Sequence, residues 1–246
     1  MKTGSVSFSA RAIGLQVTEL LVESDHPNIE SFVCTISEEG HLELQVELKN
    51  LYYEDWPNQR VILEAQQLVA ILSLHYDCRI LGFRLSGHSI EKNDGSKISS
   101  VLSSHVAIWD TAEATIRPDK NSIENFQSRC KELRHSPFPK IYSAALSQQD
   151  SVTRFMFFYN TILNLAGDRQ DEVDRLILRI ARDTPTSASP QRPSSCETIY
   201  TRLRNEIAHN REGATFDSTS SEISERVSRL GEITKRLILE MCQTSD

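Results

Sequence analysis

The sequence lacks the features of a disulfide-stabilised or membrane-spanning protein. Its cysteines are few and scattered, and they form no CxxC pair, which argues against a disulfide framework and a structural zinc site. No run approaches the roughly 20 apolar residues that cross a bilayer. The first residues, MKTGSVSFSARAIGLQV, contain no continuous apolar core of a secretory signal. We therefore expect a reduced, cytoplasmic protein without a membrane partner, a metal site or a cofactor.

Positive charge is also scarce. The chain has 27 Lys and Arg against 34 Asp and Glu, a net charge of -7, which argues against a surface that binds nucleic acid everywhere. Residues 1–150 hold 14 basic and 20 acidic side chains, whereas residues 151–246 hold 13 and 14, and 12 of those 13 basic residues are Arg. A guanidinium suits phosphate recognition, so this bias fits a polyanion partner for the C-terminal part. A solvated helix face with salt-bridge partners gives the same count.

Apolar periodicity in the first half predicts a mixed α/β domain over residues 1–136. Alternating apolar residues predict strands, and apolar residues at helical spacing predict helices. The expected strands cover residues 32–36, 42–48, 78–85 and 101–109, and the expected helices cover residues 59–75 and 121–134.

The second half, residues 137–246, is predicted to be an all-α bundle. Pro137 and Pro139 interrupt the preceding helix. Beyond them, apolar periodicity predicts a four- to five-helix bundle, so the fold class is α+β. Gly167 is placed to cap a helix at its C-terminus, and Thr219-x-x-Glu222 matches a capping box. The expected helices cover residues 140–166, 171–182, 195–209 and a segment from about 219 onward, with a flexible loop over residues 184–195.

The third of these helices ends in the hexad Arg204-Asn205-Glu206-Ile207-Ala208-His209. RNA cleavage without a metal needs a group of near-neutral pKa to move the 2′-OH proton or the leaving-group proton, and a cation to stabilise the charge on the phosphorane. Histidine meets the first need and arginine the second. We therefore assign catalysis to Arg204 and His209. Asn205 is expected to orient His209 or to bond a phosphate, and we assign substrate binding to Arg202 and Arg211.

The geometry of a straight helix constrains this group. Asn205 and His209 share a face, together with Arg202, and are expected to point to solvent or a cleft, while the side that carries Ile207 packs inward. Arg204 lies about 140° from His209 around the axis. The two can meet if the last turn distorts, if the long arginine side chain wraps round the helix, or if a second copy of the chain completes the site.

The Arg204-Asn205-x-x-x-His209 motif in a C-terminal helical bundle resembles the HEPN superfamily (higher eukaryotes and prokaryotes nucleotide-binding), whose signature is Arg, four to six residues, then His, commonly with Asn after the Arg. The resemblance covers roughly residues 140–246. It implies a metal-independent endoribonuclease that leaves 2′,3′-cyclic phosphates, with a composite site between the helices of a homodimer. It also implies a toxin or anti-phage setting, with an antitoxin or regulatory partner. The architecture is similar to the Apea-like branch of HEPN proteins.

Two other functions remain open. The bundle could be a non-catalytic module that binds nucleotide, RNA or protein, in which His209 only caps its helix by bonding free carbonyls. The α/β half could instead hold an active site around Arg84, His88 and His105. Phe157, which lies off the apolar stripe of its helix, is the candidate for a dimer interface.

Overall fold

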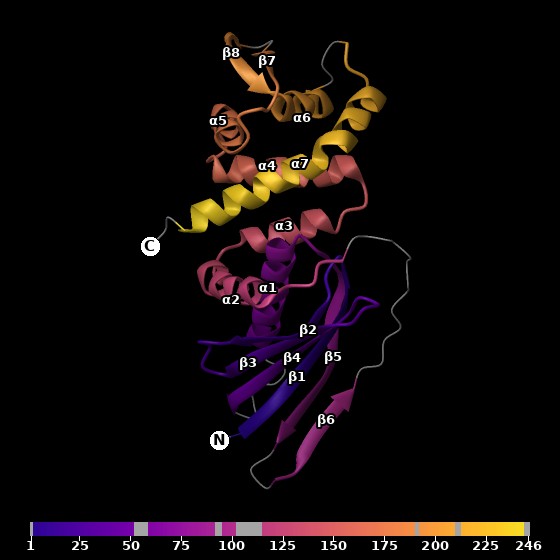
Figure 1. Cartoon of the computed structure of the whole chain (residues 1–246), viewed down its shortest axis with the longest axis vertical. Helices are drawn as coiled ribbons and strands as arrows, with labels where there is room; N and C mark the ends of the chain where they lie inside the picture. The colour runs from indigo at the N-terminus through magenta and orange to yellow at the C-terminus, as the bar shows by residue number, and fades with distance from the viewer. Residues whose placement is uncertain are drawn as a thin grey trace. The chain divides into compact units, whose positions relative to one another are not determined.

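The computed structural model describes residues 2–51, 59–91, 95–101, 115–189, 192–209 and 213–243. The chain divides into two compact units, Met1–His135 and Ser136–Asp246. The first contains an antiparallel sheet and the second is mainly helical (Figure 1). The division lies one residue before the boundary predicted from the two prolines.

The N-terminal unit is built on a six-stranded antiparallel sheet of order β2-β3-β4-β1-β5-β6. Its strands are β1 (Lys2–Ile13), β2 (Val17–Glu23), β3 (Ile29–Ile36), β4 (His41–Leu51), β5 (Arg79–Glu91) and β6 (Lys97–Val101). The expected strands at 32–36 and 42–48 are the cores of β3 and β4. Strands β1 and β2, and β6 up to residue 100, were not predicted, although β1 is an interior strand that presents Val6, Phe8, Ala10 and Ala12 to the core. Most of the expected strand at 101–109 lies outside the described residues.

One glycine fixes the turn between β3 and β4. Gly40 has φ +78°, and its carbonyl accepts a hydrogen bond from the Ala12 N–H of β1 at 2.8 Å. A Cβ at this position would stand 2.3 Å from the Ala12 carbonyl oxygen, so both the conformation and the space require glycine.

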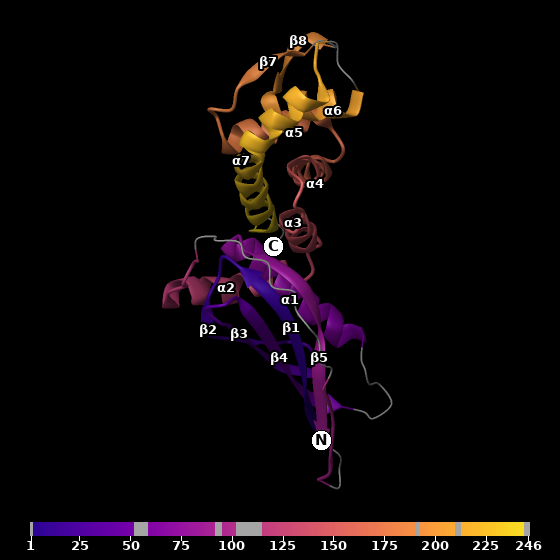
Figure 2. The same cartoon turned by 90° about the vertical axis from the view of Figure 1, so that its right-hand side faces the viewer.

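Helix α1 (Gln59–Tyr76) packs against one face of the sheet, and α2 (Lys120–Leu133) packs against α1 (Figure 2). The Asp119 carboxylate caps α2 by accepting from the Ser122 N–H at 2.8 Å. The Gln67 amide of α1 donates to the Leu133 carbonyl at 2.8 Å and joins the two helices. Both helices were predicted from their periodicity, within two residues at each end.

In the C-terminal unit, the single helix predicted over 140–166 is wrong. It is divided into α3 (Phe138–Leu146) and α4 (Ser151–Leu165). The Asp150 carboxylate begins α4 by accepting from the Thr153 N–H at 2.6 Å, a side-chain cap that favours a new helix over continuation of the old one. Gly167 follows α4 with φ +62°, as a C-terminal cap requires.

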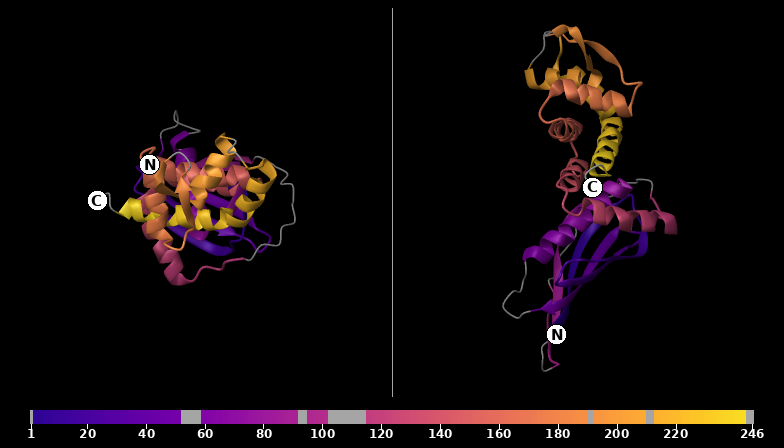
Figure 3. Two further views of the ribbon diagram at one scale, coloured as in Figure 1. Left: turned by 90° about the horizontal axis from the view of Figure 1, so that it is seen from above. Right: turned by 90° about the vertical axis from the view of Figure 1, so that its left-hand side faces the viewer.

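The predicted flexible loop over 184–195 is also wrong. After α5 (Gln170–Ile180) the chain forms an antiparallel hairpin of β7 (Thr186–Ser189) and β8 (Arg192–Thr198) (Figure 3). The hairpin occupies residues expected to start the third helix, so α6 (Ile199–His209) begins four residues later than predicted.

The last helix, α7 (Phe216–Gln243), begins three residues before the predicted position. The expected capping box is wrong, because Thr219 and Glu222 bond to α6 instead. Thr215 and Ser218 form the reciprocal cap: each hydroxyl accepts from the other residue's N–H at 3.2 Å.

Candidate functional site

The N-terminus of α6 is held by a buried carboxylate from α5. Asp174, only 8% exposed, accepts hydrogen bonds from the Thr198 N–H at 2.9 Å and the Thr198 hydroxyl at 2.7 Å. Burial raises the pKa of the Asp174 carboxyl, while hydrogen bonds from Thr201 and Thr198 oppose that rise. This clamp fixes the start of the helix that carries the Arg204 hexad.

Helix α4 supports the middle of α6. The Tyr159 hydroxyl lies 3.0 Å from the Thr201 hydroxyl, and burial raises the pKa of Tyr159 to about 12, so the phenol stays neutral. The Arg204 guanidinium carbon lies 6.0 Å from the centre of the Tyr159 ring. That distance is the outer limit of a cation–π contact.

Arg204 reaches His209 within a single chain. Its Nη1 donates to the Asn205 Oδ1 at 3.0 Å and lies 3.4 Å from the His209 Nε2. Of the three geometries open to the sequence, the long arginine side chain wrapping round the helix is the one observed. The imidazole is exposed at the end of α6. In the described ranges His209 shows no bond to a helix carbonyl, as a capping histidine would make. The cation and the titratable ring therefore already stand side by side.

Asn205 is not on a solvent-facing surface, and that part of the predicted geometry is wrong. It is 5% exposed, and its Nδ2 donates to the Glu197 Oε2 at 3.4 Å. Glu197, 4% exposed, belongs to β8, so the hairpin covers this side of α6. Ile207, expected to pack inward, is only half-buried. Asn205 thus links the Glu197 carboxylate to the Arg204 guanidinium rather than to His209.

Arg202, predicted to bind substrate, is held between two helices. Its Nη1 donates to the Glu206 Oε1 at 2.5 Å and its Nη2 to the Glu222 Oε2 at 2.6 Å, and the Arg226 Nε donates to the other Glu222 oxygen at 3.2 Å. Burial favours the neutral form of Glu222, but the hydrogen bonds and charges of Arg202 and Arg226 outweigh it and lower the pKa of the carboxyl. The two carboxylates therefore already neutralise the charge of Arg202, which was predicted to bind substrate.

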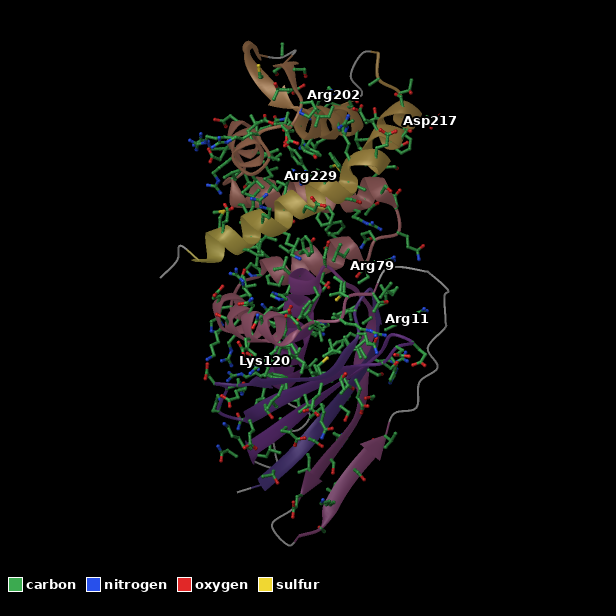
Figure 4. All side chains as sticks on the ribbon, viewed as in Figure 1. Arg11, Arg79, Lys120, Arg202, Asp217 and Arg229 are labelled. Atoms are coloured by element: carbon green, nitrogen blue, oxygen red, sulfur yellow. The ribbon has the colours of Figure 1, made fainter. Side chains whose placement is uncertain are left out.

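A polar cavity of about 370 Å³ adjoins this ion pair. Figure 4 shows Arg202 on α6 and Asp217 in the first turn of α7, the two elements that form it together with the hairpin. Its lining residues are mostly polar: Ser187, Ala188, Glu197, Arg202, Glu206, Gly213, Ala214, Ser218, Thr219 and Glu222.

Sequence reasoning did not single out Tyr159, Asp174 or Glu197 as parts of the site. Asp174 carries a usable signal, because it stands within the apolar stripe of α5, next to Val173. Glu197 carries no such sequence signal, because its role depends on the hairpin, and the composition of that segment predicts a loop.

The remaining predicted residues are Arg211, Arg84, His88 and His105. Arg211 and His105 lie outside the described residues. Arg84 and His88 both lie on β5, but Arg84 pairs with Ser9 and His88 with Val6, which face opposite sides of the sheet. These two do not form a site together.

Within the described ranges, no group of three or more His, Cys, Asp or Glu side chains is placed to hold a metal ion. In the same ranges no helix has the length and apolar character needed to cross a membrane. A scan against protein-family models gave no match, and searches of curated proteins and of solved structures gave none either.

Proposed function

We propose that this protein is a metal-independent endoribonuclease of HEPN type, in which Arg204 and His209 are the catalytic residues. The observation that carries the proposal is the 3.4 Å approach of the Arg204 Nη1 to the His209 Nε2, with Asn205 holding the same Nη1 at 3.0 Å. A permanent cation is thereby fixed beside an exposed imidazole, and this pairing supplies the two groups that the metal-independent reaction uses.

In this reaction the 2′-hydroxyl oxygen attacks the adjacent phosphorus and the bond to the 5′-oxygen breaks. His209 takes the 2′-OH proton or supplies a proton to the departing 5′-oxygen. Arg204 stabilises the charge that builds on the non-bridging phosphate oxygens. The products are a 2′,3′-cyclic phosphate and a 5′-hydroxyl. Asn205 acts as a positioning residue, because it bonds the arginine rather than the reacting atoms.

One imidazole cannot act as base and acid in the same step, so a second copy of the chain supplies the other histidine. We propose a homodimer in which two intact Arg204–His209 pairs line one RNA-binding groove, with Phe157 of α4, 38% exposed, at the interface.

A toxin or anti-phage role follows from this activity, because uncontrolled RNA cleavage is harmful to a cell. Such a nuclease must be inhibited until it is needed, either by an antitoxin or by the acidic N-terminal unit.

A non-catalytic binding module is the second candidate, and one observation favours it. The carboxylates of Glu206 and Glu222 neutralise Arg202, which leaves fewer free cations for a polyanion than a nuclease groove usually presents. Such a module would bind nucleotide or a protein partner and cut nothing.

An assay of RNA cleavage in excess EDTA distinguishes the nuclease from the non-catalytic binding module. We expect the wild type to cleave single-stranded RNA, and Arg204→Ala and His209→Ala each to lose at least a hundredfold in rate. Arg179→Ala removes an exposed arginine of α5 that pairs with Glu240 at 3.3 Å, and it should keep full activity. Circular dichroism and light scattering verify that all four proteins are folded and dimeric. Cleavage by either active-site variant at the wild-type rate would refute the assignment.

A further inference from the structure

On a straight helix, His209 is rotated by about 20° from Arg202 and by about 60° from Glu206, and it lies about 4.5 Å further along the axis than Glu206. His209 does not line the cavity, but its Cα–Cβ bond leaves the same side of α6, about one turn beyond Glu206. Since the nuclease site would place a scissile phosphate at His209, the cavity is in position for a base attached to that phosphate's ribose.

The cavity presents acceptors and donors side by side. One Glu206 oxygen accepts from Arg202 and the other from the Thr219 hydroxyl at 2.9 Å, and Glu222 divides its oxygens between Arg202 and Arg226. Each carboxylate oxygen has two lone pairs, so acceptor capacity remains. The guanidinium of Arg202 has five N–H donors and uses two of them in these ion pairs, and it is 28% exposed.

Only one RNA base matches that arrangement. Guanine places two donors, N1–H and the N2 amine, next to one acceptor, O6. A carboxylate can receive both donors while a neighbouring guanidinium donates to O6. Adenine and cytosine place a ring-nitrogen acceptor beside their amine, where it repels a carboxylate. Uracil offers a single N–H between two carbonyls.

We propose that this cavity is a guanine-binding subsite, with Glu206 and Glu222 as acceptors and Arg202 as donor, and that the RNA is cut next to an unpaired guanosine. The inference rests on the proposed nuclease function for its second part. The subsite also gives Arg202 a substrate-binding role that is compatible with its ion pairs. The arginine donates a hydrogen bond to a base instead of neutralising a phosphate. A cavity of about 370 Å³ is within the usual range for a small ligand.

Mononucleotide binding tests the subsite without cleavage. GMP, IMP and AMP are each titrated into the full-length protein by calorimetry. We expect GMP to bind at least tenfold more tightly than AMP, and IMP, which lacks the N2 amine, to bind several-fold more weakly than GMP. Glu206→Gln and Glu222→Gln should each lower GMP affinity at least tenfold. Glu225→Gln removes the same charge from an exposed position of α7 outside the cavity and should leave it unchanged.

Equal affinity for GMP and AMP, or GMP binding unaffected by both glutamine variants that circular dichroism shows to be folded, would overturn the subsite. A deoxy-oligonucleotide with a single ribonucleotide, either guanosine or adenosine, then tests cleavage in EDTA. Equal cutting at both, lost in Arg204→Ala, keeps the nuclease and overturns the guanine preference. Selective GMP binding that depends on Glu206 without any RNA cleavage supports the subsite and overturns the nuclease.

Discussion

Replacing Asp174 by alanine removes the carboxylate that accepts both the Thr198 N–H and the Thr198 hydroxyl. Thr198 and Thr201 are buried, so the two Thr198 donors and the Thr201 hydroxyl lose this partner where water does not reach them. An unsatisfied buried donor costs about 1–3 kcal/mol, and each hydroxyl can rotate toward another acceptor. We expect a loss of about 3 kcal/mol in the free energy of unfolding of the C-terminal unit, or about 12 °C in its Tm.

Hydrogen exchange measured peptide by peptide assigns that loss to one unit. Peptides of the N-terminal unit, Met1–His135, should exchange equally in Asp174→Ala and wild type. Circular dichroism at 222 nm should show the helical transition of Asp174→Ala moving to lower urea. Asp183→Ala, a matched control at an aspartate that is 84% exposed, should change stability by less than about 0.5 kcal/mol. If Asp174→Ala behaves like Asp183→Ala, the clamp does not hold α6 and the reasoning is wrong.

Three further predictions concern other parts of the molecule. Gly40→Ala should cost about 2–4 kcal/mol by urea unfolding, because φ is +78° and the new Cβ would collide with the backbone of β1. Glu222 has a lowered pKa in the folded state, so its contribution to stability is complete above its ordinary value near 4.5 and is lost as the pH falls through the folded pKa. The loss of stability between pH 5 and pH 3 should accordingly be smaller in Glu222→Gln than in wild type. Burial raises the pKa of Cys34 and Cys130 to about 12, so brief iodoacetamide treatment of the native protein at pH 8 should alkylate exposed Cys196 and spare these two, as peptide mass spectrometry would show.

The elements that the sequence predicts well are those whose apolar pattern matches one buried face. Helix α1 is such a case in its first turns, where Val61 and Ala65 are buried between more exposed residues, whereas residues 67–74 are all buried. Strand β1 was missed although Val6 and Phe8 alternate with serines, since a run of small polar residues has weak strand propensity and its central position comes from its partners β4 and β5. The break before α4 is stabilised by side-chain hydrogen bonds, the Asp150 cap and the Arg154 guanidinium that donates to the Gln148 carbonyl, which periodicity does not detect.

For the candidate site, the sequence supplies the residues to consider but not their geometry. Arg204 and His209 were chosen for the chemistry that a cation and an imidazole supply, and that choice does not depend on their arrangement. Arg204 and His209 meet within one chain because the arginine side chain is long. Rotating by 100° per residue compares only the Cα–Cβ directions of the two residues, and it takes no account of how far a side chain reaches. The burial of Asn205 depends on Glu197 and the hairpin that carries it, and a stretch rich in Ser, Thr and Pro gives no sign of that hairpin.

A heterodimer of the two active-site variants tests the central claim most directly, namely that Arg204 and His209 of the same chain act as one catalytic pair. Arg204→Ala and His209→Ala are co-expressed with different affinity tags, the mixed dimer is purified, and its RNA cleavage in EDTA is compared with wild type. This dimer keeps one histidine and one arginine, on different chains. It therefore lacks both an intact pair and the second histidine of the proposed mechanism, and we predict that it is as inactive as either variant alone. Recovery of a quarter or more of the wild-type rate would show that the arginine of one subunit serves the histidine of the other, and would contradict the pairing on which the proposed mechanism is built.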